Sequence, residues 1–322
     1  MSTGLPERMS GCECKPDRAQ PSNIWTCWML LGDFERAWQE TDRIESRRRQ
    51  GMRAEGQLVW DGTAFDGRVV LLRCDHGLDD AIQFIRYVPL LRAKCSKLVV
   101  KAKPILLPLL ETIPGIDGVI SLSDPDPAFD VQIESIELPY AFRTTLSTIP
   151  NRIPYIHVET KCAHKSDSDD FTIGLSWATG PWNNERSIRL KDLKSLRDVP
   201  GLTFHSLQWG SASAEAFGHE HGLNIRNASV PVMEDLIETA MAISQVDLVV
   251  TVDTMIAHLA GALGKPVWVL LNFDCDWRWM LEREDSPWYP TMRLFRQPRA
   301  GDWSAPIRRL KDELMTTASH VQ

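Results

Sequence analysis

The segment DLVVTVDTMIAHLAGALGKPVWVLL, residues 247–271, decides the fold class of this chain. Its two ends, 247–252 and 267–271, are apolar runs with the length of buried strands, and residues 254–263 between them fit one helix. A strand, a helix and a second strand in this order form a right-handed crossover between parallel strands. Because the same alternation recurs elsewhere in the chain, we predict an α/β protein built on parallel sheets.

The alternation of strands and helices divides the chain into two Rossmann-like lobes, residues 57–165 and residues 166–322. The polar run 165–170, preceded by Pro150 and Pro154, indicates the linker between them. Two such lobes leave a deep cleft between them, and ligands bind at the carboxyl ends of the strands. In chain order, the expected strands are 68–73, 98–100, 118–120, 130–133, 171–177, 203–207, 247–252 and 267–271, and the expected helices are 82–91, 105–110, 190–198, 211–221, 233–244 and 254–263.

A short helical hairpin is expected before the first lobe, within residues 22–56. Apolar side chains recur there at three- and four-residue steps, which is typical of helices. Gly32 and Asp33 interrupt the pattern as a turn and a helix N-cap, and a second helix is expected at 34–49. Residues 1–21, rich in proline, glycine and charge, are expected to form a disordered leader.

The composition argues against several classes of protein. The 322 residues include 36 Lys and Arg against 43 Asp and Glu, and this net charge of −7 argues against a nucleic-acid binder. No apolar run approaches the roughly 20 residues that cross a bilayer, and the N-terminus lacks the apolar region of a secretory signal. Cys12 and Cys14 have no second cysteine pair nearby, which makes a zinc site a poor interpretation. We expect a cytoplasmic protein without a bound metal.

Polar side chains follow four of the predicted strands, where ligands would bind. After the first strand, Asp79 and Asp80 open a helix, and a carboxylate there could act as a general base or could only favour the helix N-terminus. The loop that contains Thr179 and Arg186 suits an anion such as a diphosphate, although a surface loop fits the spacing equally well. Gln208 follows the next strand, where backbone groups commonly reach a nucleoside, but this signal is weak.

The fourth junction, within residues 250–266, is the most informative. Asp253 ends a strand and could bind ribose hydroxyls, and Thr254 opens a helix of small residues whose free N–H groups can bind phosphate. His258 lies four residues after Thr254 and therefore on the same helix face. The alternative is that Thr254 only caps the helix and His258 is a satisfied core histidine. Neither a GxGxxG fingerprint nor a P-loop is present, so a nicotinamide dehydrogenase is disfavoured.

Taken together, these motifs resemble bacterial glycosyltransferases of family 9, the heptosyltransferase-like type that follows tetratricopeptide repeats (TPRs). The resemblance covers about residues 24–315. The matching segments are LLGDFERAW at 30–38, GLDDAIQFIRYVPLL at 77–91, NNERSIRL at 183–190, VDTMIAHLAGALGKPVWVLL at 252–271 and, most specific, DWRWMLEREDSPWYPTMRLFRQP at 276–298.

This resemblance implies the GT-B fold, with the acceptor bound toward the first lobe, the donor bound in the second lobe and a terminal helix at about 304–317. It also implies inverting transfer of a sugar from a nucleotide-sugar donor to a glycan, lipid-linked or protein acceptor, without a metal or another cofactor. Asp80 matches the family's catalytic base. The donor-binding residues are then Thr179, Arg186, Gln208, Asp253, Thr254 and His258, and the acceptor or cleft residues are Gln83, Asp276 and Arg278. From the same tail segment, Trp277, Trp288 and Tyr289 either shape the cleft or pack in the core.

Two departures from the family pattern limit what the resemblance implies. The family's Leu-Gly-Asp reads Leu78-Asp79-Asp80 here, and Asp79 would add negative charge and, if the glycine needs a positive φ, backbone strain. The repeat region is reduced to one TPR-like hairpin, which must pack on the lobes or expose an apolar strip that includes Trp25 and Trp28. The rival interpretations are a catalytically degenerate scaffold and a GT-B nucleotide-sugar epimerase. The hairpin could also contact a protein, and the chain could associate peripherally with the inner face of the membrane.

Overall fold

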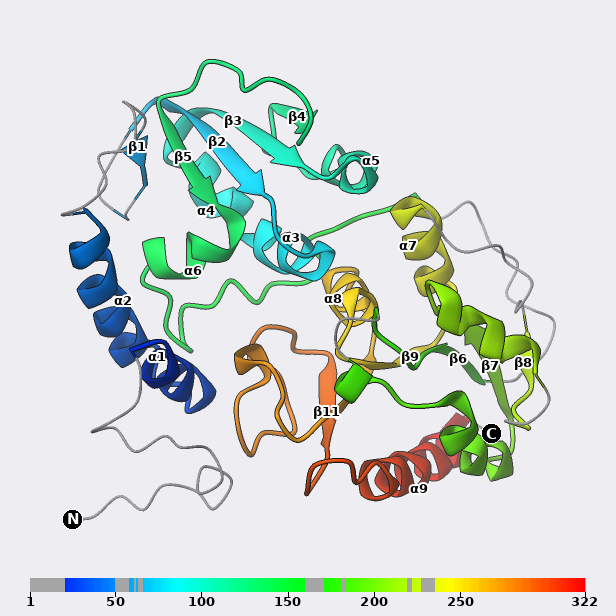
Figure 1. Ribbon diagram of the computed structural model, residues 1–322. Coiled ribbons are helices and arrows are strands. Elements are labelled where there is room, and N and C mark those ends of the chain that lie inside the picture. Colours follow the sequence, from blue (N-terminus) through cyan, green and yellow to red (C-terminus); the bar gives the residue numbers. More distant parts are fainter. Residues whose placement is uncertain are drawn as a thin grey trace, which may run out of the picture.

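The computed structural model describes residues 21–49, 58–60, 62, 66–159, 171–180, 184–218, 222–226 and 235–321. Within these ranges the chain forms two α/β lobes, each built on a parallel sheet, and a helical hairpin beside the first lobe (Figure 1). The two-lobed α/β architecture expected from the sequence is confirmed. The leader expected at 1–21 lies almost entirely outside the described residues, and the limits assigned to the hairpin and the two lobes stay predictions. None of the described helices is long and apolar enough to cross a membrane.

The first lobe contains a five-stranded sheet in the order β1-β5-β2-β3-β4. All four expected strands are present, and β1 is added at the edge as a two-residue strand that is too short to leave a sequence pattern. The helix expected at 82–91 is divided by a 3₁₀ turn, because Pro89 cannot donate the backbone hydrogen bond that a continuous helix needs. The strands are β1 Leu58–Val59, β2 Arg68–Cys74, β3 Cys95–Ala102, β4 Gly118–Ser121 and β5 Val131–Glu134; the helices are α3 Leu78–Phe84, η2 Ile85–Tyr87, α4 Val88–Arg92, η3 Pro104–Leu106, α5 Leu107–Leu110, η4 Ser135–Glu137 and α6 Leu138–Ala141.

The second lobe contains a six-stranded sheet in the order β11-β10-β9-β6-β7-β8. Two of its strands were not predicted from the sequence. β8 has only two residues, and β11, with the sequence MRLFR, contains two arginines that interrupt the apolar run typical of a buried strand. The segments expected as helices at 190–198 and 211–221 are 3₁₀ helices, and the second ends at Phe217. The strands are β6 Phe171–Ser176, β7 Leu202–Ser206, β8 Ile225–Arg226, β9 Leu248–Val252, β10 Val267–Leu271 and β11 Met292–Arg296; the helices are η5 Asn184–Arg186, η6 Leu190–Asp198, η7 Ser211–Phe217, α7 Leu236–Ser244, α8 Met255–Ala262, η8 Trp277–Trp279 and α9 Ser304–Val321.

The helix start expected at residue 233 is also corrected by the structure, since α7 begins at Leu236. The Asp235 carboxylate caps this helix by accepting hydrogen bonds from the N–H groups of Ile237 at 2.6 Å and Glu238 at 3.3 Å. The expected terminal helix is present as α9.

The central strands of the second sheet are buried on both faces, which explains why β9 and β10 read as continuous apolar runs. Successive residues of β9 enter different cores: Val249 packs with α7 and α8, whereas Val250 packs with η6 and α9. The core around α7 and α8 continues without a break into the first lobe and the hairpin. The two lobes are therefore joined through packed side chains, with α3 of the first lobe against α8 of the second.

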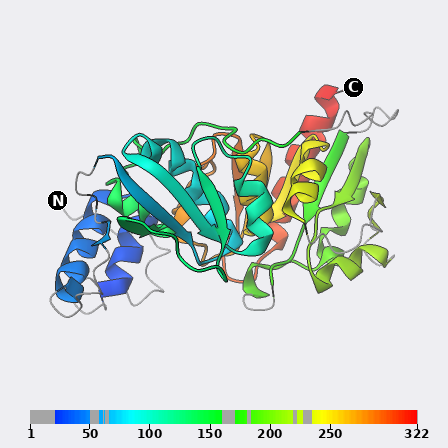
Figure 2. The same ribbon diagram turned by 90° about the horizontal axis from the view of Figure 1, so that it is seen from above.

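The hairpin consists of α1 Pro21–Leu30 and α2 Phe34–Arg49 and lies beside the first lobe, at the end of the molecule away from the second sheet (Figure 2); it also contacts η8 of the second lobe. Asp33 caps α2 through a hydrogen bond from the N–H of Arg36 to its Oδ1 at 3.2 Å, as expected. The Trp38 indole donates to the carbonyl of Thr144 at 2.7 Å, and the N–H of Leu281 donates to the carbonyl of Leu30 at 2.9 Å. Of the two outcomes expected for a single hairpin, packing on the lobes is therefore the one observed, while its assignment as a TPR stays a prediction.

Candidate functional site

Asp80 reaches the carboxyl edge of the first sheet because α3 begins just beyond β2. Its Oδ2 accepts a hydrogen bond from the N–H of Gly77 at 3.0 Å, which holds the carboxylate over the first helical turn. A Cβ at position 77 would lie 2.1 Å from Oδ1 of Asp79, so Gly77 leaves the room that the neighbouring carboxylates occupy. Asp79 itself lies within α3 and does not have a positive φ. The backbone strain considered for this position is therefore absent.

Five charged side chains form a continuous series of ion pairs between the lobes, which we call the interlobe charge network: Asp80, Arg278, Asp276, Arg186 and Asp253. Arg278 donates through Nη2 to Oδ1 of Asp80 in the first lobe, and its Nη1 lies 3.2 Å from Oδ2 of Asp276. Arg186 continues the series, with Nη2 at 3.9 Å from Oδ2 of Asp276 and Nη1 at 3.0 Å from Oδ2 of Asp253. Five residues singled out from the sequence thus meet at one place.

Burial raises the pKa of both end carboxylates of the network. The Asp253 side chain is only 3% exposed, and burial raises its pKa to about 6 although the Arg186 guanidinium acts in the opposite direction. The pKa of Asp80 is also raised by burial, while Arg278 favours its ionised form. The network contains three carboxylates and two guanidinium groups, so its formal charge is −1 when all five are ionised. This excess of negative charge acts with burial to favour the neutral form of Asp253.

His258 lies beside the network and is neutral. It is fully buried in α8, and burial together with the Arg278 and Arg86 guanidinium groups lowers its pKa well below the usual value. Its Nδ1 lies 3.0 Å from the Tyr289 hydroxyl, and its Nε2 lies 4.0 Å from Oδ1 of Asp253 without a hydrogen-bond partner among the described residues. His258 is therefore a hydrogen-bonding group of the site and not a cation.

The remaining donor-side residues differ in how much of their side chain is available. Thr254 occupies the N-cap position of α8, but its hydroxyl makes no cap and lies 3.3 Å from the Thr251 hydroxyl. The hydroxyl of Thr179 lies 3.1 Å from the hydroxyl of Ser187, and Ser187 directly follows Arg186 in the chain. Gln208 is fully occupied: its Oε1 accepts from the N–H groups of residues 177 and 178, and its Nε2 donates to the carbonyls of residues 178 and 209.

Gln208 therefore shapes the loop after β6 from within and offers no free amide group to a ligand. Its assigned role as a donor-binding residue, like those of the other site residues, stays a prediction.

Gln83 has the opposite character to Gln208. It lies one turn after Asp80 on α3 and is completely buried, and neither atom of its amide has a hydrogen-bond partner within the described part of the chain. An unpaired buried amide is costly, which makes Gln83 a strong candidate to bind a ligand.

Arg86 is a buried cation behind the network that was not predicted as a site residue from the sequence. Arg86 donates to the carbonyls of Gln83, at 2.8 Å, and Trp288, and to the Tyr155 hydroxyl at 3.0 Å. Its guanidinium also lies 4.2 Å from the centre of the Tyr289 ring. In the sequence, Arg86 is recognisable only as a charge within the apolar run IQFIRYVPLL, residues 82–91. Its partners Tyr155 and Trp288 come from distant parts of the chain, so no local pattern indicates them.

Aromatic rings surround Arg278 and connect it to the hairpin. Its guanidinium lies 5.4 Å from the ring centres of both Phe84 and Trp277. Trp277 in turn packs against Trp25 at 5.7 Å and Phe34 at 6.3 Å, both in the hairpin. Trp288 and Tyr289 are fully buried, so for these two the packing alternative of the sequence analysis is the one observed.

Within the described ranges, no three His, Cys, Asp or Glu side chains gather as a group that could hold a metal ion.

Comparison with known proteins places this geometry in a known fold. No known family profile matches the sequence. A curated relative, Protein FlbA of Caulobacter vibrioides, is 25% identical, and the match covers 81% of this chain and 48% of the relative. The chain thus spans about half the length of the curated relative that it matches.

Three solved structures share the architecture of this chain. The family 9 glycosyl transferase of Veillonella parvula superposes with a TM-score of 0.56 at 11% identity, over 80% of this chain and 98% of the other. The ADP-heptose lipopolysaccharide heptosyltransferase II of E. coli gives 0.54 at 14% identity, over 78% and 98%. E. coli heptosyltransferase WaaC with ADP gives 0.50 at 13% identity, over 78% and 99%. The chain therefore has the GT-B fold expected from the sequence, while the link to the TPR-associated type stays a prediction.

Proposed function

We propose that this chain is an inverting, metal-independent glycosyltransferase that moves a sugar from a nucleotide-sugar donor to an acceptor hydroxyl. The observation that carries the proposal is the interlobe charge network. It joins Asp80, in the first turn of the helix after β2, to Arg186, in the connection after β6, and to Asp253, directly after β9. In α/β sheets the carboxyl ends of the strands are where ligands bind.

In the proposed reaction, Asp80 is the general base. Its carboxylate removes the proton of the acceptor hydroxyl while the acceptor oxygen bonds to the anomeric carbon of the donor. The bond from that carbon to the nucleoside diphosphate breaks, and the diphosphate leaves with the electron pair. Burial raises the pKa of Asp80 and makes it a stronger base, whereas Arg278 keeps it ionised near neutral pH.

The donor-binding residues of the second lobe have complementary roles. Arg186 neutralises charge on the leaving diphosphate together with the N-terminal N–H groups of α8, which perform this task without a metal. Asp253 accepts hydrogen bonds from ribose hydroxyls, and neutral His258 presents its unpaired Nε2 to the same region. Thr179 and Thr254 add hydroxyl groups at the two loop ends. Gln208 acts indirectly by holding the loop after β6.

The acceptor is bound from the first lobe and the tail segment. Gln83 offers a buried amide without a partner in the described residues, one helical turn from Asp80. Asp276 and Arg278 would line the same region, with Arg278 moving from Asp80 to the acceptor as it enters. We place the reaction in the cytoplasm, with a glycan, a lipid-linked molecule or a protein as acceptor and with peripheral contact at the inner membrane face. The hairpin is proposed as a surface for protein contact.

The experiment that tests this proposal combines ligand binding and turnover. The purified protein is heated with a panel of nucleoside diphosphates and nucleotide sugars, with and without EDTA. A ligand at a hundredfold excess over its Kd stabilises the native state by about 2.7 kcal/mol, so one nucleotide should raise Tm independently of EDTA. The matching nucleotide sugar is then incubated with candidate acceptors, and release of the nucleoside diphosphate is measured.

Asp80→Asn should lower kcat by about 10²- to 10⁴-fold while the nucleotide still raises Tm. The control is Asp79→Asn, which removes the adjacent carboxylate in the same helical turn and should retain activity within a few fold. Full activity of Asp80→Asn would reject Asp80 as the base. Absence of a Tm shift with every nucleotide would favour the degenerate scaffold, and isomerisation of the donor without an acceptor would favour an epimerase.

A further inference from the structure

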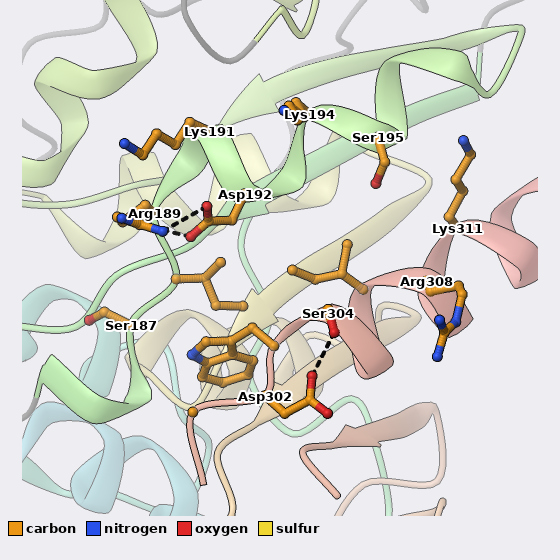
Figure 3. A pocket seen from close by; sticks show the side chains of 14 residues that line it. Ser187, Arg189, Lys191, Asp192, Lys194, Ser195, Asp302, Ser304, Arg308 and Lys311 are labelled. Carbon is orange, nitrogen blue, oxygen red and sulfur yellow. Dashed lines mark hydrogen bonds and ion pairs between the residues drawn. The ribbon is translucent and has the colours of Figure 1, made fainter. Parts of the chain in front are cut away.

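A large open cavity lies on the second lobe, outside the interlobe charge network (Figure 3). Its volume is about 1130 Å³, slightly above the range of about 300–1,000 Å³ that is typical of small-molecule sites. One wall is formed by residues 187–195, which include the first six residues of η6, and the other by residues 301–311, which include the first turns of α9. Neither wall contains a residue of the network.

The cavity is strongly basic in a protein of net charge −7. Five cationic side chains and two carboxylates line it: Arg189, Lys191, Lys194, Arg308, Lys311, Asp192 and Asp302. Both carboxylates already have partners. Asp192 accepts two hydrogen bonds from Arg189, at 2.8 and 3.0 Å, and Asp302 accepts from the Ser304 hydroxyl at 2.6 Å. Arg189 neutralises Asp192, whereas the Ser304 hydroxyl leaves the charge of Asp302 in place, so the five cations and two carboxylates give the lining a formal charge of +3.

Three of these cations have no partner among the described residues. Lys311 is held by Asp198 at 2.8 Å, but Lys191, Lys194 and Arg308 make no ion pair or side-chain hydrogen bond within the described ranges. All three side chains are exposed; Lys191 and Lys194 come from one wall, and Figure 3 shows Arg308 on the other wall, across the opening from Lys191. Two unpaired ammonium groups on one wall suit a phosphate group, whose oxygens accept several hydrogen bonds.

The cavity also has an aromatic component. Trp303 lines the cavity and is partly buried against the core of the lobe. An aromatic face with hydroxyl groups nearby, here those of Ser187, Ser195 and Ser304, suits a sugar ring better than a bare inorganic anion. A concave site of this size also fits a discrete ligand better than a flat lipid surface.

We propose that this cavity binds a phosphorylated sugar, with the phosphate at Lys191 and Lys194 and a sugar ring on Trp303. The two sites meet at one loop, because Ser187 of the cavity follows Arg186 of the network directly in the chain. They share no residue, so phosphorylated-sugar binding at this cavity does not depend on the proposed sugar transfer.

The test is isothermal titration calorimetry of the full chain with trehalose 6-phosphate, trehalose and inorganic phosphate. We expect trehalose 6-phosphate to bind at least tenfold more tightly than either of the other two, and more weakly as sodium chloride is added. The double variant Lys191→Ala/Lys194→Ala should lose at least tenfold in affinity. The control is Lys97→Ala/Arg152→Ala, which removes the same charge from exposed first-lobe positions and should bind as the wild type does.

Four results would overturn the proposal. Inorganic phosphate binding as tightly as trehalose 6-phosphate would show an anion site without sugar recognition. Equal loss of affinity in the control variant would show that only the net charge matters. Binding to phosphatidylglycerol vesicles without binding of trehalose 6-phosphate would assign the cavity to a membrane surface. Finally, trehalose 6-phosphate binding that is lost in Asp253→Asn but retained in the lysine double variant would place the ligand in the donor site.

Discussion

Replacing Asp253 with asparagine should stabilise the protein at pH 8, although Asp253 belongs to an ion pair. Asparagine keeps the shape of the side chain and removes its charge. The Asp253 carboxyl is buried, and burial raises its pKa to about 6, even with Arg186 at 3.0 Å. Because the same carboxyl ionises near 3.8 in the unfolded chain, its ionisation favours unfolding.

The magnitude follows from the two pKa values. Because the pKa of Asp253 is higher in the folded state than in the unfolded state, protonation of its carboxyl group stabilises the folded state. This stabilisation is fully present below pH 3.8 and is lost as the pH rises through about 6. The wild type should therefore lose about 3 kcal/mol of unfolding free energy from this group by pH 8, and about half of that by pH 5. An asparagine side chain cannot ionise, so Asp253→Asn should be more stable than the wild type by these amounts, with the larger difference at pH 8.

Urea unfolding of both proteins at pH 5, 6.5 and 8 measures this difference. Asp126→Asn is a control of opposite sign, since hydrogen bonds from Lys101 and Arg73 lower the pKa of Asp126. The stability that Asp126 contributes is present at neutral pH and is lost as the pH falls, so Asp126→Asn should destabilise most at pH 8. A less stable Asp253→Asn at pH 8, or a difference that does not change with pH, would refute the reasoning. The ion pair with Arg186 would then outweigh burial.

Three further substitutions test the packing around the site and the pH dependence of the reaction. Gly261→Ala places a Cβ 2.4 Å from the Tyr289 ring and should destabilise by about 1–3 kcal/mol in urea unfolding, whereas Gly118→Ala, with no atom within 4 Å, should change little. An unchanged stability of Gly261→Ala would contradict the close packing of α8. Phe34→Ala in the hairpin should cost about 3–5 kcal/mol, against less than about 0.5 kcal/mol for the same substitution at exposed Phe217, and equal effects would mean that the hairpin is not docked. Arg278→Gln removes the cation that lowers the pKa of Asp80, so the acidic limb of the pH profile of kcat/KM should move to higher pH; an unmoved limb would separate Arg278 from the base.

The sequence predicted the residues of the network but not their pairing. Asp80, Arg186 and Asp253 were recognisable because each follows a strand, where parallel sheets collect ligand-binding groups. Their order in space was not, since Arg278 lies 198 residues from Asp80 in the chain. Whether Asp80 faces water, an arginine or a second carboxylate depends on how the lobes meet. No local pattern encodes that contact.

The elements that the sequence did not predict have local causes. β1 and β8 have two residues each, and such strands exist only through hydrogen bonds to a longer neighbour, β5 and β7 respectively. The segment 190–198 carries the helical pattern of apolar residues, but its backbone is 3₁₀, which side-chain periodicity over nine residues does not distinguish from an α-helix. Arg86 was missed because its partners are carbonyl and hydroxyl groups supplied by tertiary structure and not by a nearby carboxylate.

Trp277 connects the hairpin to the site. A single helical hairpin has an apolar face that must be covered, and here Trp277 covers it by packing against Trp25 and Phe34. The opposite neighbours of Trp277 are Phe84, at 6.4 Å, and the guanidinium of Arg278. Because Arg278 also holds Asp80, the packing that makes the hairpin stable also fixes the cation next to the proposed base. The helices α1 and α2 therefore support the proposed site through this packing.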